Sequence, residues 1–505
     1  ILISSSICVL LFQFFRSIAT MRFENKVDAS LQAAVWDRLL ALPVPFFRKF
    51  STGDLAMRAM SINTIRQTIS GTVFSTFLTG TFSVFNFFLL FYYNMKLAII
   101  SVALTAVAML IYLAIMVLQY KYSKLTMDLE GKLSGLVFGL INGVAKFRVA
   151  GAESRAFGLW AKLFKEKKEI PVYMLTNVME VFNSVYMLMC TGIFFWCIIT
   201  YADDKSMTAG SFVAFNSAFS TFFSGMISIS SSMMSFLNVY TLYERAKPIL
   251  ETVPEFDEAK EDPGELNGGV EISGVTFKYE GSLTPALNDV SISVKPGEFV
   301  AIVGPSGSGK STLIRLLLGF DKPLSGAILY DGHDLSGVDV RAVRRQIGVV
   351  LQNGQLMSGN IMSNIIGTST LTIEDAWNAA RSAGVAEDIE NMPMGMHTMI
   401  SEGASTISGG QKQRLLIARA LVKKPRIIIF DEATSALDNK TQSIVSESLE
   451  NLHATRVVIA HRLSTIIKAD RIFVVENGRV IENGNYEELI KRNGLFKKLA
   501  ERQIA

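Results

Sequence analysis

The sequence predicts a multidomain chain, in which an all-α polytopic membrane domain precedes an α/β domain. Half of its 505 residues are hydrophobic and the mean hydropathy is +0.33, which is more apolar than a purely soluble enzyme. The long apolar runs all fall within residues 1–240, whereas residues 268–505 have the composition of a soluble α/β domain. Between them, residues 251–265 are acidic and interrupted by proline and glycine, as in a solvated connector. We therefore expect domains at 1–240 and 268–505, joined by a linker at 241–267.

Five runs in the first part are candidates for membrane-spanning helices, which need about 20 mostly apolar residues. They cover residues 1–20, 70–93, 97–118, 178–201 and 210–238. The first run could instead be a signal peptide, but no basic segment precedes it and no small-residue cleavage site is obvious. The abundant Phe and Met side chains could line an adaptable apolar cavity, although packing against lipid is the favoured interpretation.

Charged residues predict the orientation of these helices. The segment 119–177 carries ten lysine and arginine residues and fewer acidic ones, whereas the short loop at 202–205 is acidic. The positive-inside rule therefore places the segments 21–69 and 119–177 in the cytoplasm. Within the apolar runs, Glu180 and Arg16 each lie near a helix end, where they could simply reach the interface. This pattern contains no proton relay and argues against an ion-coupled carrier.

Bulk charge and cysteine content exclude other classes. The formal net charge of +4 gives no indication of nucleic-acid binding. Cys8, Cys190 and Cys197 all fall in apolar runs, so neither a disulfide framework nor a metal-ligand spacing is expected. The α/β domain contains no cysteine, which is compatible with a reducing cytosol.

A glycine-rich loop lies between an apolar strand at 299–303 and a helical stretch at 312–317. This order is typical of a P-loop, in which backbone N–H groups and the helix dipole hold the phosphates of a nucleotide. Lys310 would reach the β- and γ-phosphates, and the Ser311 hydroxyl would hold Mg²⁺. The nucleotide-binding residues predicted here are Gly304, Pro305, Ser306, Gly307, Ser308, Gly309, Lys310, Ser311 and Thr312.

Further motifs follow the P-loop in a fixed order. The chain reads Ile-Ser-Gly-Gly-Gln at 407–411, and a buried strand at 427–430 runs into Asp431 and Glu432. Gln352 follows an apolar strand at 347–351. Taken with the P-loop, these strings resemble the ATP-binding cassette of ABC proteins.

The resemblance implies a role for each matching residue. Asp431 would contact Mg²⁺ through water, Glu432 would polarise the attacking water, and His461 would be the switch histidine at the γ-phosphate. Gln352 would belong to the Q-loop beside Mg²⁺ and Asp438 to the D-loop. Tyr279 would stack on adenine, which is favoured over the alternative of a packed aromatic residue. The other histidines lie in polar contexts and are expected to be solvated: His333, His397 and His453.

One cassette per chain implies a dimer in the family. ATP is bound there between the P-loop of one cassette and the Ser-Gly-Gly-Gln string of the other, which here comprises Ser408, Gly409, Gly410 and Gln411. The cofactors implied are ATP and Mg²⁺, and the partner is a second copy or a related half-transporter.

The membrane part resembles ABC exporters with six helices per half. Residues 42–55 and 147–153 occupy the places of the two coupling regions, although the prolines in the first could act only as a helix stop. Because the chain starts at Ile1, we expect the first visible run to be the second of the six helices. The resemblance implies a bacterial plasma-membrane protein with its cassette in the cytoplasm.

Three cassette stretches are similar to NHLM-type exporters, which are associated with the export of ribosomally made peptides such as bacteriocins: 349–354, 392–397 and 400–403. Many exporters have proline where Leu351 stands, and this departure favours peptide export over a multidrug or lipid pump. Two other classes are alternatives: a soluble ABC ATPase acting on nucleic acid or ribosomes, and an ATP-gated regulator or channel. The apolar runs argue against the first, and the presence of Glu432 and His461 argues against the second.

Overall fold

The computed structural model describes residues 2–200, 208–256, 260–401, 407–431, 439–460 and 462–504. The chain forms two compact units, Ile1–Glu255 and Phe256–Ala505, the first helical and the second mixed α/β. The last helix of the first unit reaches Glu251, so residues 241–251 of the expected linker are helical. The division at 240 and 268 otherwise stays a prediction.

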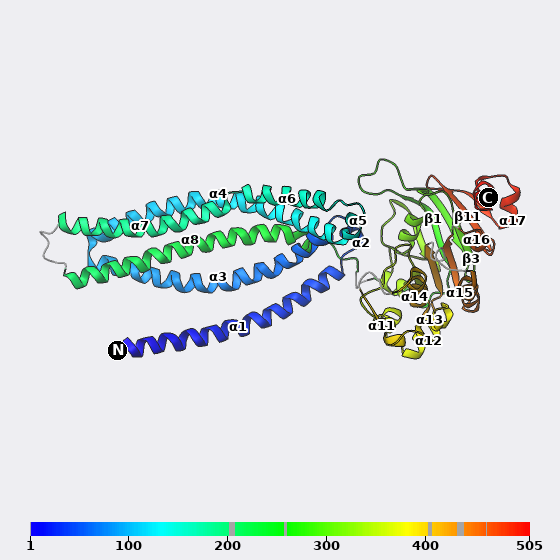
Figure 1. Cartoon of the computed structure of the whole chain (residues 1–505), viewed down its shortest axis with the longest axis horizontal. Coiled ribbons are helices and arrows are strands. Elements are labelled where there is room, and N and C mark those ends of the chain that lie inside the picture. The colour runs from blue at the N-terminus through cyan, green and yellow to red at the C-terminus, as the bar shows by residue number, and fades with distance from the viewer. Residues whose placement is uncertain are drawn as a thin grey trace. The chain divides into compact units, whose positions relative to one another are not determined.

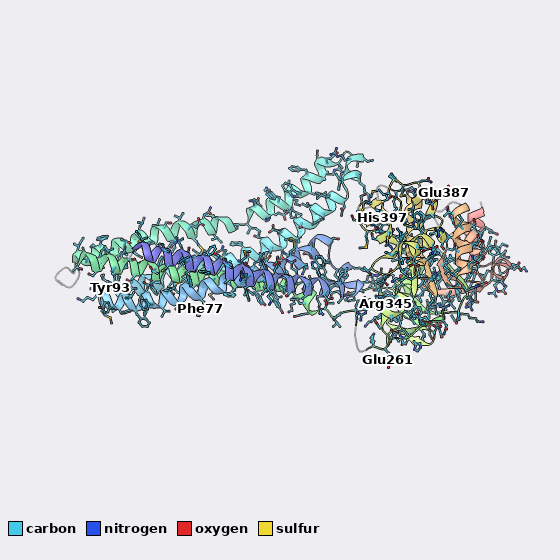
Figure 2. The ribbon with its side chains drawn as sticks, turned by 90° about the horizontal axis from the view of Figure 1, so that it is seen from below. Phe77, Tyr93, Glu261, Arg345, Glu387 and His397 are labelled. Carbon is cyan, nitrogen blue, oxygen red and sulfur yellow. The ribbon has the colours of Figure 1, made fainter. Side chains whose placement is uncertain are left out.

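Long helices make up most of the first unit, and α3, α4, α7 and α8 run along one another (Figure 1). Phe77 and Tyr93 mark the course of α3 in Figure 2. The described helices of this unit are α1 (Leu2–Leu40), α2 (Val44–Arg48), α3 (Thr52–Tyr93), α4 (Met95–Asn142), α5 (Val144–Val149), α6 (Glu153–Glu169), α7 (Val172–Thr200) and α8 (Ala209–Glu251).

The segments predicted to be cytoplasmic are helical extensions of the apolar runs. The short helices α2 and α5 lie at the turns between the extensions, where the sequence predicts the two coupling regions. Pro43 precedes α2 with an extended backbone and Pro45 lies in its first turn, a position that tolerates the missing N–H. Asn94 ends α3 and caps α4 by accepting hydrogen bonds from the backbone N–H groups of Lys96 and Leu97.

Three helical segments among the described residues have the length and hydropathy of a membrane span: Met95–Asn142, Asn177–Thr200 and Ala209–Glu251. The runs at 1–20 and 70–93 lie in α1 and α3. Some side chains of these two helices are not among those that the structure describes. Phenylalanines fill the core between α7 and α8, where the rings of Phe194 and Phe219 meet edge to face with centroids 4.8 Å apart. Many other apolar side chains are exposed, for example Phe85 and Trp196, which suits a surface in contact with lipid.

Two main sheets build the second unit. A four-stranded antiparallel sheet has the order β2-β1-β4-β5, and a six-stranded sheet has the order β12-β11-β3-β10-β9-β6, in which only β12 is antiparallel. The strands are β1 (Val270–Phe277), β2 (Leu287–Val294), β3 (Phe299–Val303), β4 (Ser325–Tyr330), β5 (His333–Asp334), β6 (Ile347–Val350), β9 (Ile427–Asp431), β10 (Thr455–Ile459), β11 (Arg471–Glu476) and β12 (Arg479–Gly484), with a small pair of β7 (Gly359–Asn360) and β8 (Met399–Ile400).

The six-stranded sheet is covered on both faces, which explains its continuous apolar strands. Alternate residues of β3 belong to different cores: Ala301 and Val303 pack with the helical side, and Val300 and Ile302 pack with the antiparallel sheet. The remaining described helices include α9 (Lys310–Leu317), α10 (Val340–Arg345), α11 (Ile361–Ile366), α12 (Ile373–Ser382), α13 (Ala386–Glu390), α14 (Gly409–Leu421), α15 (Asn439–Asn451), α16 (Leu463–Ile466), α17 (Tyr486–Lys491) and α18 (Leu495–Ile504). Helices α11 to α14 cluster together (Figure 1), and Glu387 and His397 belong to this side (Figure 2).

Candidate nucleotide site

The loop between β3 and α9 has a backbone suited to phosphate. Gly304, Gly307 and Gly309 have φ angles of 155°, 81° and 105°, in the region that favours glycine. A Cβ at Gly309 would also lie 2.7 Å from the carbonyl oxygen of Ala286, so a larger residue does not fit. Ser306 is exposed at the tip of the loop. Gly309 is the N-cap of α9, so the unpaired N–H groups of the first helical turn face the loop.

Lys310 begins α9 and its side chain is held against the loop. The ammonium group donates hydrogen bonds to the carbonyl oxygens of Gly304 and Pro305, each 2.8 Å long. Lys310 is only 7% exposed. Ser308 is also buried, and its hydroxyl has no hydrogen-bond partner within the described residues. The loop therefore gathers a cation, backbone donors and an unpartnered hydroxyl, which are the groups that bind the phosphates of a nucleotide.

The parallel strand order brings Asp431 to the same edge of the sheet. Ile459 of β10 is in register with Ile302 of β3 on one side and with Asp431 of β9 on the other. Asp431 therefore ends β9 two strands across the sheet from β3, which leads into the loop, and adjacent strands lie about 4.8 Å apart. Asp431 is 5% exposed. Ligands of open α/β sheets bind at this carboxyl edge, where the strand ends meet.

Gln352 follows β6, which is the next strand beyond β9. Its side chain is exposed, and the strand order places it on the same edge as Asp431. The segment after it is tied to α14: Lys412 donates to the side-chain oxygen of Gln355 at 2.7 Å, and Arg419 donates to the Gln355 carbonyl at 3.2 Å. A shift of this segment would therefore change its hydrogen bonds with α14.

Tyr279 lies beside the first turn of α9. Its hydroxyl is 3.0 Å from Oγ1 of Thr312, and its ring packs edge-on against Phe277 with centroids 4.9 Å apart. The ring is half-buried and next to the phosphate loop. This position is compatible with both expectations for Tyr279, so stacking on adenine stays a prediction.

The Ser-Gly-Gly-Gln string forms the start of α14. Ser408 Oγ accepts from the N–H of Gln411 at 3.2 Å, and Gln411 Oε1 accepts from the N–H of Ser408 at 2.9 Å, which together form a capping box. Gln411 and Arg414 each donate to a carboxylate oxygen of Asp388, at 2.9 and 2.7 Å. The two intervening glycines leave the helix terminus without side chains beyond Cα. The positive end of a 13-residue helix is thus fixed in place and suited to an anion.

Sequence reasoning missed residues that support these two motifs. The N–H of Gly478 donates to the carbonyl oxygen of Ser308 at 3.1 Å, and a Cβ at Gly478 would lie 2.7 Å from the Ala286 carbonyl. The Asn477–Gly478 dipeptide is a common hairpin signal and could have revealed this turn. The sequence around Asp388 contains no such motif, because the residues that donate hydrogen bonds to it lie 23 and 26 positions further along the chain.

Three predicted site residues lie outside the described part of the chain: Glu432, Asp438 and His461. Their predicted roles as general base, D-loop residue and switch histidine stay predictions. The remaining histidines are exposed, as the sequence led us to expect: His333, His397 and His453.

The described residues fit a nucleotide with Mg²⁺. They contain no group of three or more His, Cys, Asp or Glu side chains that could hold a metal ion. A nucleotide-bound Mg²⁺ needs fewer protein ligands, because phosphate oxygens and water complete its shell. The Ser311 hydroxyl in the first turn of α9 and the buried Asp431 carboxylate are of the required chemical type.

Fold and site together define a polytopic membrane protein with one nucleotide-binding P-loop domain. Comparison with protein families extends this conclusion. The family described as ABC transporter transmembrane region matches residues 1–226, and the family described as ABC transporter matches residues 287–435.

Individual relatives are similar in sequence over nearly the whole chain. The exotoxin translocation ATP-binding protein PaxB of Pasteurella aerogenes is 32% identical, over 95% of this chain and 68% of its own length. The cyclolysin secretion/processing ATP-binding protein CyaB of Bordetella pertussis is also 32% identical, over 94% of this chain and 67% of its own length. The chain thus spans about two thirds of the length of these relatives.

A solved structure matches the fold of both parts. The structure of a bacterial Atm1-family ABC exporter with ATP bound has a TM-score of 0.86 and 28% identity, over 98% of this chain and 88% of that one. The chain belongs to the ABC transporter family. It is an ATP-driven exporter, an ATP hydrolase coupled to transport, and the predicted fold class of a helical membrane domain fused to an ATP-binding cassette is confirmed.

Proposed function

We propose that this exporter moves a ribosomally made peptide or a protein out of the bacterial cytoplasm. The observation that carries the proposal is the similarity of 94–95% of the chain to ATP-binding proteins named for toxin translocation and secretion. The same names give no support to the alternative function, a multidrug or lipid pump. The narrower NHLM-type assignment stays a prediction.

The working unit proposed is a dimer with two composite ATP sites. One chain supplies one P-loop, with Lys310 on the β- and γ-phosphates, and one α14 terminus, whose Ser408 would contact the γ-phosphate held by the other chain. Both Ser408 and the loop tip at Ser306 are exposed, which leaves them free to meet a second cassette. ATP binding would close the pair, and hydrolysis would reopen it.

The residues at the carboxyl edge of the six-stranded sheet, together with the loop, are proposed to carry out the remaining steps. Ser311, Asp431 and Gln352 would hold Mg²⁺, which neutralises charge on the phosphates when bound. Glu432 would orient and polarise the attacking water, and His461 would contact the γ-phosphate. Lys310 and the N–H groups of the loop are already oriented, so they can stabilise developing charge with little rearrangement.

The proposed orientation puts the cassette in the cytoplasm of a bacterium and the apolar runs in its plasma membrane. It rests on the basic character of the segment 119–177. The predicted coupling roles of α2 and α5 concern how the two units communicate and stay predictions.

Transport into inside-out vesicles tests this function. We expect ATP-dependent uptake of a leader-bearing or processed peptide by the chain and no uptake by a Glu432→Gln variant, which should still bind ATP. A lipophilic dye serves as the competing cargo. Uptake of the dye without uptake of either peptide would refute peptide export and support a drug or lipid pump.

A further inference from the structure

A large cavity lies in the helical unit between α4, α7 and α8. Its volume is about 770 Å³, and six of its sixteen lining residues are methionines, although the whole chain has only 21 methionines among 505 residues. The flexible, polarisable Met side chain can adapt to apolar groups of different shape. The sequence left open whether Met and Phe line a cavity or face lipid; here the methionines concentrate on a cavity wall.

Among the described residues that line the cavity, Glu180 on α7 is the one with a charged side chain. The other described residues of the wall are neutral; they include Gln119 on α4 and Asn183 on α7, and no lysine or arginine is among them. Its backbone oxygen accepts from Ser184 at 3.1 Å, whereas no ion pair or hydrogen bond to its carboxylate is found within the described residues. Glu180 is exposed, so its carboxylate is accessible from the cavity.

An ionised carboxylate beside an apolar wall is unfavourable unless a cation or hydrogen-bond donor approaches it. Ionisable residues in membrane segments therefore commonly mark a binding path. Glu180 lies near the start of the apolar run 178–201, on the side that the orientation of the segment 119–177 places towards the cytoplasm. A cargo entering from that side would meet the carboxylate and the methionines in the same cavity.

The second large cavity gives a comparison within the same unit. It has a volume of about 800 Å³ and lies on residues of α7 from Met174 to Met189. No charged side chain is found among the described residues that line it. A carboxylate therefore distinguishes the first cavity from the second, and Glu180 supplies it.

We propose that the α4–α7–α8 cavity binds an apolar peptide segment that carries one cationic side chain, and that Glu180 selects this segment by pairing with the cation. The methionine wall accepts varied apolar neighbours, whereas an acidic residue in the same place is repelled. This inference rests on the proposed peptide export and specifies the class of segment that is recognised.

Binding and transport are measured separately to test it. Three fluorescent peptides of one apolar sequence carry Lys, uncharged norleucine or Glu at the central position. Their binding to the full chain in lipid nanodiscs is followed by fluorescence anisotropy. We expect the lysine peptide to bind most tightly and the Glu180→Gln variant to lose about tenfold in affinity for it, the loss expected for one charge-assisted hydrogen bond. Affinity for the norleucine peptide should not change.

Two further variants separate charge recognition from structural damage. Glu180→Lys should reverse the preference, so that the glutamate peptide binds more tightly than the lysine peptide, which misfolding would not produce. Glu166→Gln removes an exposed carboxylate from α6, outside the cavity, and should leave all three affinities unchanged.

Equal binding of the three peptides, no binding of the lysine peptide, or full affinity in Glu180→Gln would overturn the inference. ATP-dependent uptake of the same peptides reports on the proposed function instead. Selective binding without uptake would contradict peptide export and leave charge recognition supported, whereas uptake without selectivity would do the reverse.

Discussion

Replacing Gly131 with alanine should weaken the helical unit, although alanine is the better helix former. Gly131 is buried in α4 against an ion-pair cluster that joins α3 and α8. Arg245 donates to Asp54 at 3.1 Å, and Arg58 donates to the other oxygen of that carboxylate at 2.8 Å. A Cβ at position 131 would lie 2.7 Å from Nη2 of Arg245, the nitrogen that binds Asp54.

The magnitude follows from two opposing effects. Alanine in place of glycine in a helix interior contributes about 0.5–1 kcal/mol of stability. Displacing Arg245 breaks a charge-assisted hydrogen bond between side chains that are only 12% and 22% exposed, and such a bond contributes about 1.5–3 kcal/mol. The broken bond outweighs the helix propensity, so we expect a net loss of about 1–2 kcal/mol.

Thermal unfolding in detergent measures the difference. A loss of 1 kcal/mol lowers the Tm of a unit of this size by about 2–4 °C. The relevant transition is the one that ATP does not raise, because ATP stabilises the cassette. Gly158→Ala in the middle of α6 is the matched control, since nothing lies within 4 Å of its added Cβ, and it should raise the Tm. If both variants raise the Tm equally, the cluster does not hold the helices together and the reasoning is wrong.

Three other substitutions address the cassette. Gly309→Ala should abolish ATP binding, measured with a fluorescent nucleotide, because the φ of 105° and the nearby Ala286 carbonyl both exclude a Cβ; wild-type affinity would contradict this. Arg419→Met should lower the cassette's free energy of unfolding by about 2–4 kcal/mol, because the half-buried guanidinium, whose pKa burial lowers, holds Asn364 through two 2.7 Å hydrogen bonds; an unchanged denaturant midpoint would refute it. The backbone and hydroxyl of Thr372 donate to Asp375 and lower its pKa, so the start of α12 should be protected from hydrogen exchange above about pH 4 and lose protection as the pH falls through the lowered pKa. Asp375→Asn should remove that pH dependence, and its persistence would show that another group controls the helix end.

Local features of the cassette could be predicted from the sequence. The strand before the P-loop and the start of the following helix depend on residues adjacent in the chain, and the structure has the strand at Phe299–Val303, as expected. The strand that ends at Asp431 was equally visible, because five consecutive buried residues leave one polar group at its end. The order of the motifs then predicted that the nucleotide binds at the carboxyl edge of the sheet.

Contacts between distant residues could not be predicted. Hydropathy placed the end of the membrane domain at residue 240, but α8 continues to Glu251 because Arg38 of α1 caps its carbonyl groups, including that of Leu250 at 2.8 Å. Likewise, Asp54 and Arg245 are 191 positions apart. Glu180 was interpreted from sequence as a residue near the interface, and its cavity emerges only when three helices pack together.

Cross-linking between two copies tests the dimeric ATP site most directly. One copy carries Ser306→Cys in the P-loop and a differently tagged copy carries Ser408→Cys at the start of α14, both on an otherwise cysteine-free chain with Glu432→Gln. The account predicts a disulfide between the two tags that increases when ATP is added, because ATP brings the P-loop of one chain to α14 of the other. Absence of the inter-chain product with ATP, under conditions where both thiols react with a small maleimide, would contradict it.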